Sequence, residues 1–113
     1  MYDKLLIFQK TYELLLWLYP VVNRIPKGHR LVLGKQLEEL GVLLLISIIK
    51  ANKARGKKRT ELQLSLSDEL DTLRILIRLT KDVRCMSVKQ YTIGAEKINE
   101  IGRMLTSWMK VII

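Results

Sequence analysis

Positively charged side chains are the feature of this sequence whose residue types and spacing could do chemistry. Six of them lie in the stretch KANKARGKKR at 50–59, and three more follow at spacings of four and three, which places them on one face of a helix. Cations that neutralise phosphates release counterions, so such side chains bind nucleic acid with strong salt dependence and little sequence preference. The candidates are Lys50, Lys53, Arg55, Lys57, Lys58, Arg59, Arg74, Arg78 and Lys81.

The charge of the whole chain favours the same class of ligand. Of 113 residues, 20 are lysine or arginine and 11 are acidic, which gives a net charge of +9. A charge of that sign attracts polyanions, either nucleic acid or an anionic membrane. The membrane is the weaker candidate, because the basic tract lacks interleaved bulky apolar residues. The alternative is a solvated face whose charge only keeps the protein soluble.

Groups for catalysis or metal binding are sparse. His29 is the single histidine and Cys85 the single cysteine, so a histidine-based metal site or a Ser-His-Asp relay has nothing else to draw on. Asp68, Glu69 and Asp71 lack the Glu-x-x-His pattern of di-iron bundles, and no glycine-rich phosphate-binding motif occurs. We predict a protein that is not an enzyme and has no metal or cofactor. His29 is interpreted as a solvated or capping residue and Cys85 as a packing residue.

The sequence has no pattern for export or membrane insertion. One cysteine cannot form an intrachain disulfide, and the N-terminal MYDKLLIFQK does not resemble a signal peptide. The most apolar stretch, Leu40 to Ile49, is half as long as the roughly 20 residues that a membrane-spanning helix needs. We expect a cytoplasmic protein that does not interact with a membrane.

Apolar periodicity predicts four helices and no strands. Pro20 and Pro26 should end the first helix, and a second helix is predicted from about His29 to Asn52, with Gly56 near its C-terminal end. The first helix is indicated by apolar residues three and four apart, namely Leu5, Phe8, Tyr12, Leu15, Tyr19 and Val22.

Two capping boxes predict the starts of the remaining helices. TELQ at 60–63 should open the third helix, which continues to about Arg84, and SVKQ at 87–90 should open the fourth. The third helix has its predicted core side at Leu66, Leu70, Leu73 and Leu76. The fourth helix has an unbroken seam at three-four spacing, made of Val88, Tyr91, Ala95, Ile98, Gly102, Leu105, Met109 and Ile112.

Helices of this length joined by short loops must return antiparallel. The sequence therefore predicts an all-α, up-down-up-down four-helix bundle that forms a single domain over residues 1–113. Its apolar surface exceeds what one bundle interior requires, and monomers rarely expose large contiguous apolar patches, so we expect a homo-oligomer. The alternative is that these residues lie singly on the surface, as scattered apolar side chains normally do. The apolar residues predicted to lie away from the core are Ile75, Leu79, Ile101, Met104 and Trp108.

The order of several segments resembles a known family. ANKARGKKR, LRILIRL, SVKQY and EIGRMLTSWMK occur in this order, and the resemblance extends from about Leu18 to Lys110. Together they resemble the accessory variability determinant (Avd) proteins of diversity-generating retroelements. These proteins belong to a wider four-helix-bundle family that includes proteins encoded in ribosomal-RNA intervening sequences.

The resemblance implies an assembly and a set of partners. It implies a pentameric barrel of basic protomers that associates with the retroelement's reverse transcriptase and with template RNA, with DNA as a further candidate, during mutagenic cDNA synthesis. It also adds Arg84 to the candidate binding residues. The alternative is a structural oligomerisation protein of the intervening-sequence type that has no role in nucleic-acid binding.

Overall fold

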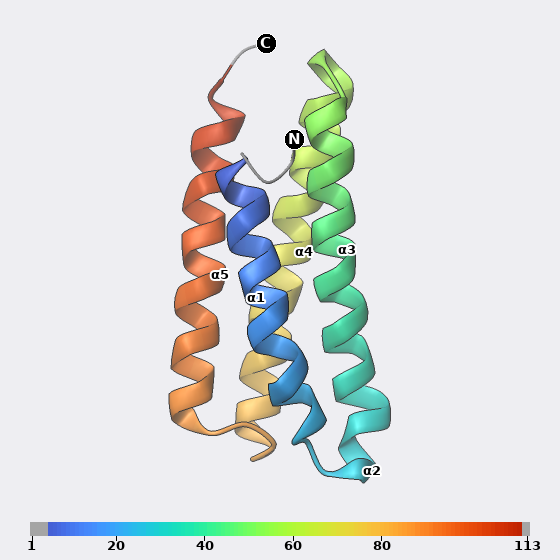
Figure 1. Ribbon diagram of the computed structural model, residues 1–113, viewed down its shortest axis with the longest axis vertical. Helices are drawn as coiled ribbons and strands as arrows, with labels where there is room; N and C mark the ends of the chain where they lie inside the picture. The colour runs from blue at the N-terminus through green and yellow to red at the C-terminus, as the bar shows by residue number, and fades with distance from the viewer. Residues whose placement is uncertain (1–4, 112–113) are drawn as a thin grey trace.

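The computed structural model describes residues 5–111, and these residues form helices and connecting turns without a strand (Figure 1). Four long helices account for most of the chain, α1 (Leu6–Asn23), α3 (Lys35–Lys53), α4 (Gly56–Asp82) and α5 (Val88–Met109). The short α2 (Lys27–His29) and a π-helical turn, η2 (Arg30–Gly34), lead into α3. The described residues form the predicted four-helix bundle, with principal extents of 45 × 23 × 23 Å.

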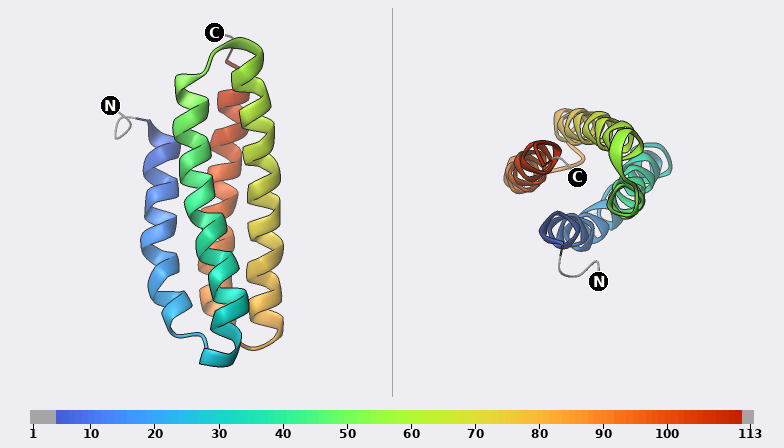
Figure 2. Two further views of the ribbon diagram at one scale, coloured as in Figure 1. Left: turned by 90° about the vertical axis from the view of Figure 1, so that its right-hand side faces the viewer. Right: turned by 90° about the horizontal axis from the view of Figure 1, so that it is seen from above.

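The long helices run antiparallel and form a ring in the order α1, α3, α4, α5, so that α5 also packs against α1 (Figure 2). The start of α1, the α3–α4 connection and the end of α5 lie at one end, here called the apical end (Figure 1). The α1–α2 and α4–α5 connections lie together at the other, basal end. Alternating helix direction therefore brings together residues that are far apart in the sequence.

The core is a continuous set of apolar side chains from all four long helices. On α4, Leu66, Leu70 and Leu73 are buried as predicted, while Leu76 is only partly buried. On α1 the predicted face is wrong in part, because Tyr12 and Tyr19 are exposed. The buried face of α1 comprises Ile7, Thr11, Leu14, Leu15, Leu18, Val21 and Val22.

The buried face of α5 is also rotated from the predicted seam. Val88 is 70% exposed, whereas Gly94 and Ile101, which lie outside the seam, are buried. At Gly94, a Cβ would lie only 2.7 Å from the Cη2 atom of the Trp17 indole on α1. Glycine at this position thus lets α1 and α5 approach closely. Ile112 of the predicted seam lies outside the described residues.

Gly41 performs a similar role between α1 and α3. A Cβ at this position would lie 2.5 Å from the Cδ2 atom of Leu15. The close approach that Gly41 permits is therefore between helices of one subunit.

The first connection differs from the prediction at Pro20. Helix α1 continues through Pro20 to Asn23, so the proline lies in the last turn of the helix and does not end it. Pro26 is the N-cap residue of the short α2, and its carbonyl accepts hydrogen bonds from the amides of His29 and Arg30. The Arg30 guanidinium donates a hydrogen bond to the Asn23 carbonyl at 3.2 Å, which ties the turn to the end of α1.

One of the two predicted capping boxes is wrong and the other is confirmed. Helix α4 begins at Gly56, which has a positive φ of 56°, so Thr60 lies within the helix and its hydroxyl donates to the Gly56 carbonyl. Ser87 does cap α5, because its Oγ accepts from the Gln90 amide and its own amide donates to Gln90 Oε1, both at 3.0 Å.

Candidate nucleic-acid interface

Five predicted cations form an exposed group at the apical end, which we call the apical basic tract. It comprises Lys50, Lys53, Arg55, Lys57 and Lys58. The last turn of α3, the two-residue connection and the first turn of α4 carry them, so the hairpin between two helices brings them together. Within the described part of the chain, no acidic side chain forms an ion pair with Lys50, Lys57 or Lys58.

The local shape of the apical basic tract is concave. A shallow hollow of about 470 Å³ is lined by Lys50, Lys53 and Lys58 together with Ala54 and Leu62. Three ammonium groups around one hollow create a local positive potential, and among the described residues Lys50 and Lys58 have no ion-paired carboxylate. The arrangement can bind phosphate groups by charge and by the hydrogen bonds of ammonium groups.

Arg59 does not belong to this exposed surface. Its side chain is buried, with 8% of the residue exposed. Its Nε donates to the Ala51 carbonyl at 3.0 Å, its Nη2 donates to the Asn52 carbonyl at 2.9 Å, and its guanidinium lies over the ring of Trp108. A cation that binds the last carbonyls of α3 stabilises the helix end. Arg59 therefore connects α3, α4 and α5 rather than facing solvent.

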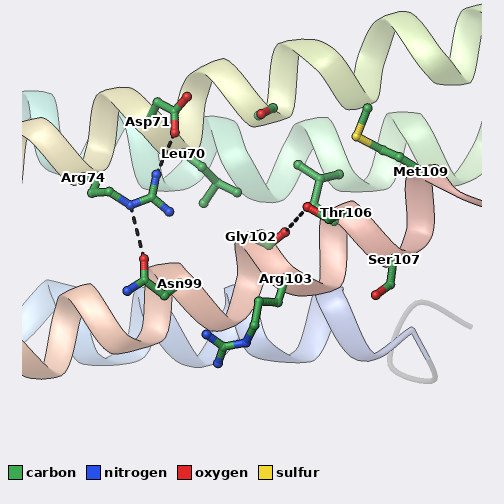
Figure 3. Close-up of a pocket in the computed structure, with 11 residues that line it drawn as sticks. Leu70, Asp71, Arg74, Asn99, Gly102, Arg103, Thr106, Ser107 and Met109 are labelled. Atoms are coloured by element: carbon green, nitrogen blue, oxygen red, sulfur yellow. Dashed lines mark hydrogen bonds and ion pairs between the residues drawn. The ribbon is translucent and has the colours of Figure 1, made fainter.

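The three cations predicted to form a stripe along α4 are present, but each has a partner within the bundle. Arg74 forms an ion pair with Asp71 at 2.6 Å and donates to Asn99 at 3.3 Å across the α4–α5 groove (Figure 3). Arg78 and Lys81 both form ion pairs with Asp82, at 3.8 and 3.4 Å. Acidic neighbours reduce the charge of this stripe, so it is less positive than the apical basic tract.

The five residues predicted to contact another subunit divide into three kinds. Ile75 and Leu79 on α4 are exposed, at 66% and 44%. Met104 and Trp108 are half-buried and pack against the core. The prediction for Ile101 is wrong, because its side chain is fully buried in the core and cannot contact another subunit unless the bundle unfolds.

Exposed apolar side chains also lie on the neighbouring helices α1 and α3, and none of them is among the five residues predicted to contact another subunit. These are Tyr12, Leu16 and Tyr19 on α1 and Val42, Leu43 and Ile46 on α3. On α3 the signal is the apolar character of Gly41 to Ile49 on nearly every side, which is typical of a helix buried on more than one side.

The groups considered for catalysis remain separate. His29 is exposed in α2, and Cys85 lies half-buried in the α4–α5 connection. Glu69 accepts a hydrogen bond from Ser47 of α3 at 2.9 Å, and burial raises the pKa of its carboxyl group. Across residues 5–111, no three His, Cys, Asp or Glu side chains gather as a metal site would require.

No helix among the same residues is long and apolar enough to cross a membrane.

Comparison with known families agrees with this arrangement. Residues 5–112 match the bAvd-like family model, which is nearly the whole chain. The chain belongs to the bAvd-like family. The resemblance to Avd proteins seen in the sequence is thereby confirmed. No curated protein matches the chain.

Membership of the bAvd-like family indicates the general role of the chain. Avd-type proteins are accessory proteins and not catalysts, and the family suggests a role alongside a diversity-generating retroelement.

A second group of cations lies at the basal end, and sequence analysis identified only part of it. Arg24 from the α1–α2 connection, Lys81 from the last turn of α4 and Arg84 from the α4–α5 connection line one hollow. Arg24 was missed because it is 60 positions from Arg84 in the sequence. The signal was available in the topology, since the first and third connections of an up-down bundle lie at the same end.

Proposed function

We propose that this protein is a non-catalytic, nucleic-acid-binding accessory subunit of the reverse transcriptase of a diversity-generating retroelement. In this role it holds template RNA near the polymerase during mutagenic cDNA synthesis, and DNA is a second candidate ligand. The polymerase supplies the chemistry. The observation that carries the proposal is the apical basic tract, exposed on a member of the bAvd-like family.

The electrostatics support nucleic acid as the ligand of this tract. Lys50, Lys57 and Lys58 have no ion-paired carboxylate among the described residues, so their charge is available to an external anion. Binding through such groups releases counterions and reads little sequence. Weak sequence preference suits a subunit that must hold any part of a template RNA.

Self-association is the second part of the proposal. The exposed apolar side chains on α1 and α3, with Ile75 and Leu79 on α4, favour contact between copies, because monomers rarely leave so many exposed. A homopentamer is the state that the resemblance to Avd proteins implies. In a closed ring each apical basic tract is repeated around the axis, so that the positive fields add.

The test compares RNA affinity at several salt concentrations for the wild type and a Lys57→Ala, Lys58→Ala double variant. Arg59 is left in place, because its removal would damage the fold. Each lost phosphate contact should reduce the slope of log affinity against log salt by about 0.7 for a single strand, or about 1.4 for both. Lys35→Ala, Lys97→Ala removes the same charge elsewhere and serves as the control. Equal affinity and slope in both variants and the wild type would refute the role of the tract.

The polymerase requires its own measurement. Co-purification of the protein with a retroelement reverse transcriptase should succeed for the wild type, and native mass spectrometry should show one closed oligomer. An oligomer that binds neither RNA nor the polymerase would favour the alternative function, a structural oligomerisation protein of the intervening-sequence type.

A further inference from the structure

The basal end contains a hollow of about 550 Å³ between the α1–α2 connection and the α4–α5 connection. Arg24, Lys81 and Arg84 contribute three positive charges to its lining, and no acidic residue lines it. Arg24 and Arg84 have no ion-paired carboxylate in the described part of the chain, whereas Lys81 pairs with Asp82 and lies 4.5 Å from the centroid of the Tyr91 ring. The hollow is therefore a separate concentration of positive charge, remote from the apical basic tract.

The backbone of Arg84 is the feature that distinguishes this hollow from an ordinary basic surface. Arg84 has a φ of 66°, in the left-handed region, and no other non-glycine residue among those described has a positive φ. It ends α4 in the conformation that normally favours glycine, with its amide bonded to the Lys81 carbonyl and the Cys85 amide bonded to the Thr80 carbonyl. A non-glycine residue in this conformation is strained relative to glycine, and the strain here falls on a residue that lines the hollow.

The start of α5 adds to the same potential. Ser87, Val88 and Gln90 line the hollow, so the positive end of the α5 dipole faces it. The capping box satisfies the Ser87 and Gln90 amides but leaves the usual unbonded amides of a first helical turn. A tetrahedral anion suits a hollow that combines two guanidinium groups with a helix start.

We propose that the basal hollow binds a phosphate group of the same nucleic acid that the apical basic tract binds, with Arg24 and Arg84 as the principal contacts. This inference rests on the proposed function and extends it to a second contact point. Helix α4, with 27 residues, separates the two ends by about 40 Å. That length equals about 12 base pairs of duplex at 3.4 Å each, so one nucleic acid can reach both ends along the bundle.

The experiment measures affinity for a single-stranded RNA of about 20 nucleotides against salt, together with the melting temperature of each variant. Arg24→Gln and Arg84→Gly should each weaken binding about fivefold and reduce the salt slope by about 0.7. Lys89→Gln is the matched control, because it removes the same charge at the same end from an exposed residue that does not line the hollow.

Arg84→Gly separates binding from stability. Because glycine adopts the left-handed conformation without strain, its melting temperature should rise by up to about 4 °C while RNA affinity falls. A fall in melting temperature with unchanged affinity would show that Arg84 is a structural residue and would overturn the inference. An equal loss of affinity in Lys89→Gln would also overturn it, because diffuse charge would then explain the effect.

The remaining outcomes separate this inference from the proposed function. If RNA binding depends on Lys57 and Lys58 but not on Arg24 and Arg84, only the basal contact is wrong. If the wild type binds no RNA, both proposals fail. Repeating the titration with RNA bearing a 5′-hydroxyl or a 5′-phosphate, and with inorganic phosphate as competitor, identifies the phosphate involved. A backbone phosphate predicts equal affinity for the two RNAs and weak competition, whereas a preference for the 5′-phosphate would overturn an internal contact.

Discussion

Replacement of Arg59 by alanine is the most direct test of how charge is divided between structure and binding in this protein. Arg59 lies in the most basic stretch of the sequence, next to the exposed Lys58, yet its guanidinium is buried against Ala51, Asn52 and Trp108. Arg59→Ala should therefore destabilise the fold, whereas Lys58→Ala should change the free energy of unfolding by less than about 0.5 kcal/mol.

The magnitude follows from the contacts that are lost. The two charge-assisted hydrogen bonds of Arg59 contribute about 1.5 kcal/mol each, which gives about 3 kcal/mol. The Ala51 and Asn52 carbonyls each keep another donor, the Ala54 amide and the Arg55 side chain, so neither carbonyl is left without a partner. The contact with Trp108 adds about 0.5 to 1 kcal/mol. The total loss is about 3.5 to 4 kcal/mol, which for 113 residues lowers the melting temperature by about 14 to 16 °C.

Circular dichroism at one fixed protein concentration provides the assay, with thermal and urea unfolding of the wild type, Arg59→Ala and Lys58→Ala. Arg59→Lys is a further comparison and should recover only part of the loss, because an ammonium group lacks the planar fork that reaches both carbonyls. A loss below about 1 kcal/mol in Arg59→Ala would refute the reasoning. It would mean that the guanidinium is solvated and that Arg59 belongs with the surface cations after all.

Three further predictions concern the helix ends, the helix contacts and pH. Ser87→Ala should cost about 1 kcal/mol in urea unfolding, because it removes the confirmed cap of α5. Gly94→Ala should cost about 1 to 3 kcal/mol despite the better helix propensity of alanine, because the new Cβ would displace the Trp17 ring. Burial raises the pKa of Glu69, so the folded state binds its proton more tightly than the unfolded state does. The proton on Glu69 therefore stabilises the folded state at pH values below the pKa of this carboxyl group in the unfolded chain, and this stabilisation is lost as pH rises through its pKa in the folded state. Glu69→Gln should remove this pH-dependent loss of stability in unfolding curves measured from pH 4 upward.

Each of these predictions has a matched comparison. Thr60→Ala should leave stability nearly unchanged, because Thr60 lies inside α4. A loss of stability equal to that of Ser87→Ala would mean that Thr60 does cap a helix, as the sequence predicted. Gly28→Ala should be neutral or stabilising, because nothing lies within 4 Å of its Cβ position. If Gly94→Ala behaves in the same way, the Trp17 contact is not tight. Asp68→Asn tests the lesser charge effect on Glu69, and a pH dependence that disappears in this variant alone would rule out burial as the main cause.

The sequence was sufficient for the number of long helices and their direction. Hydrophobic periodicity and short connections leave an antiparallel bundle as the economical solution, and the core of α4 at Leu66, Leu70 and Leu73 follows from spacing alone. Net charge and the basic stretch at 50–59 indicate a polyanion without any coordinates. The Ser87 cap was also predictable, because a capping box uses only residues three apart in the sequence.

Only the tertiary structure decided which side chains face inward and which cations are free to bind. Periodicity cannot show which neighbour a helix packs against, and on α5 the buried Gly94 lies against the Trp17 ring of another helix. Similarly, the sequence shows Lys58 and Arg59 as equivalent charges, but Arg59 meets the carbonyl groups at the end of α3 and is withdrawn from solvent. Charge is a property of each residue, whereas burial and ion pairing depend on neighbours that the fold brings together from distant parts of the chain.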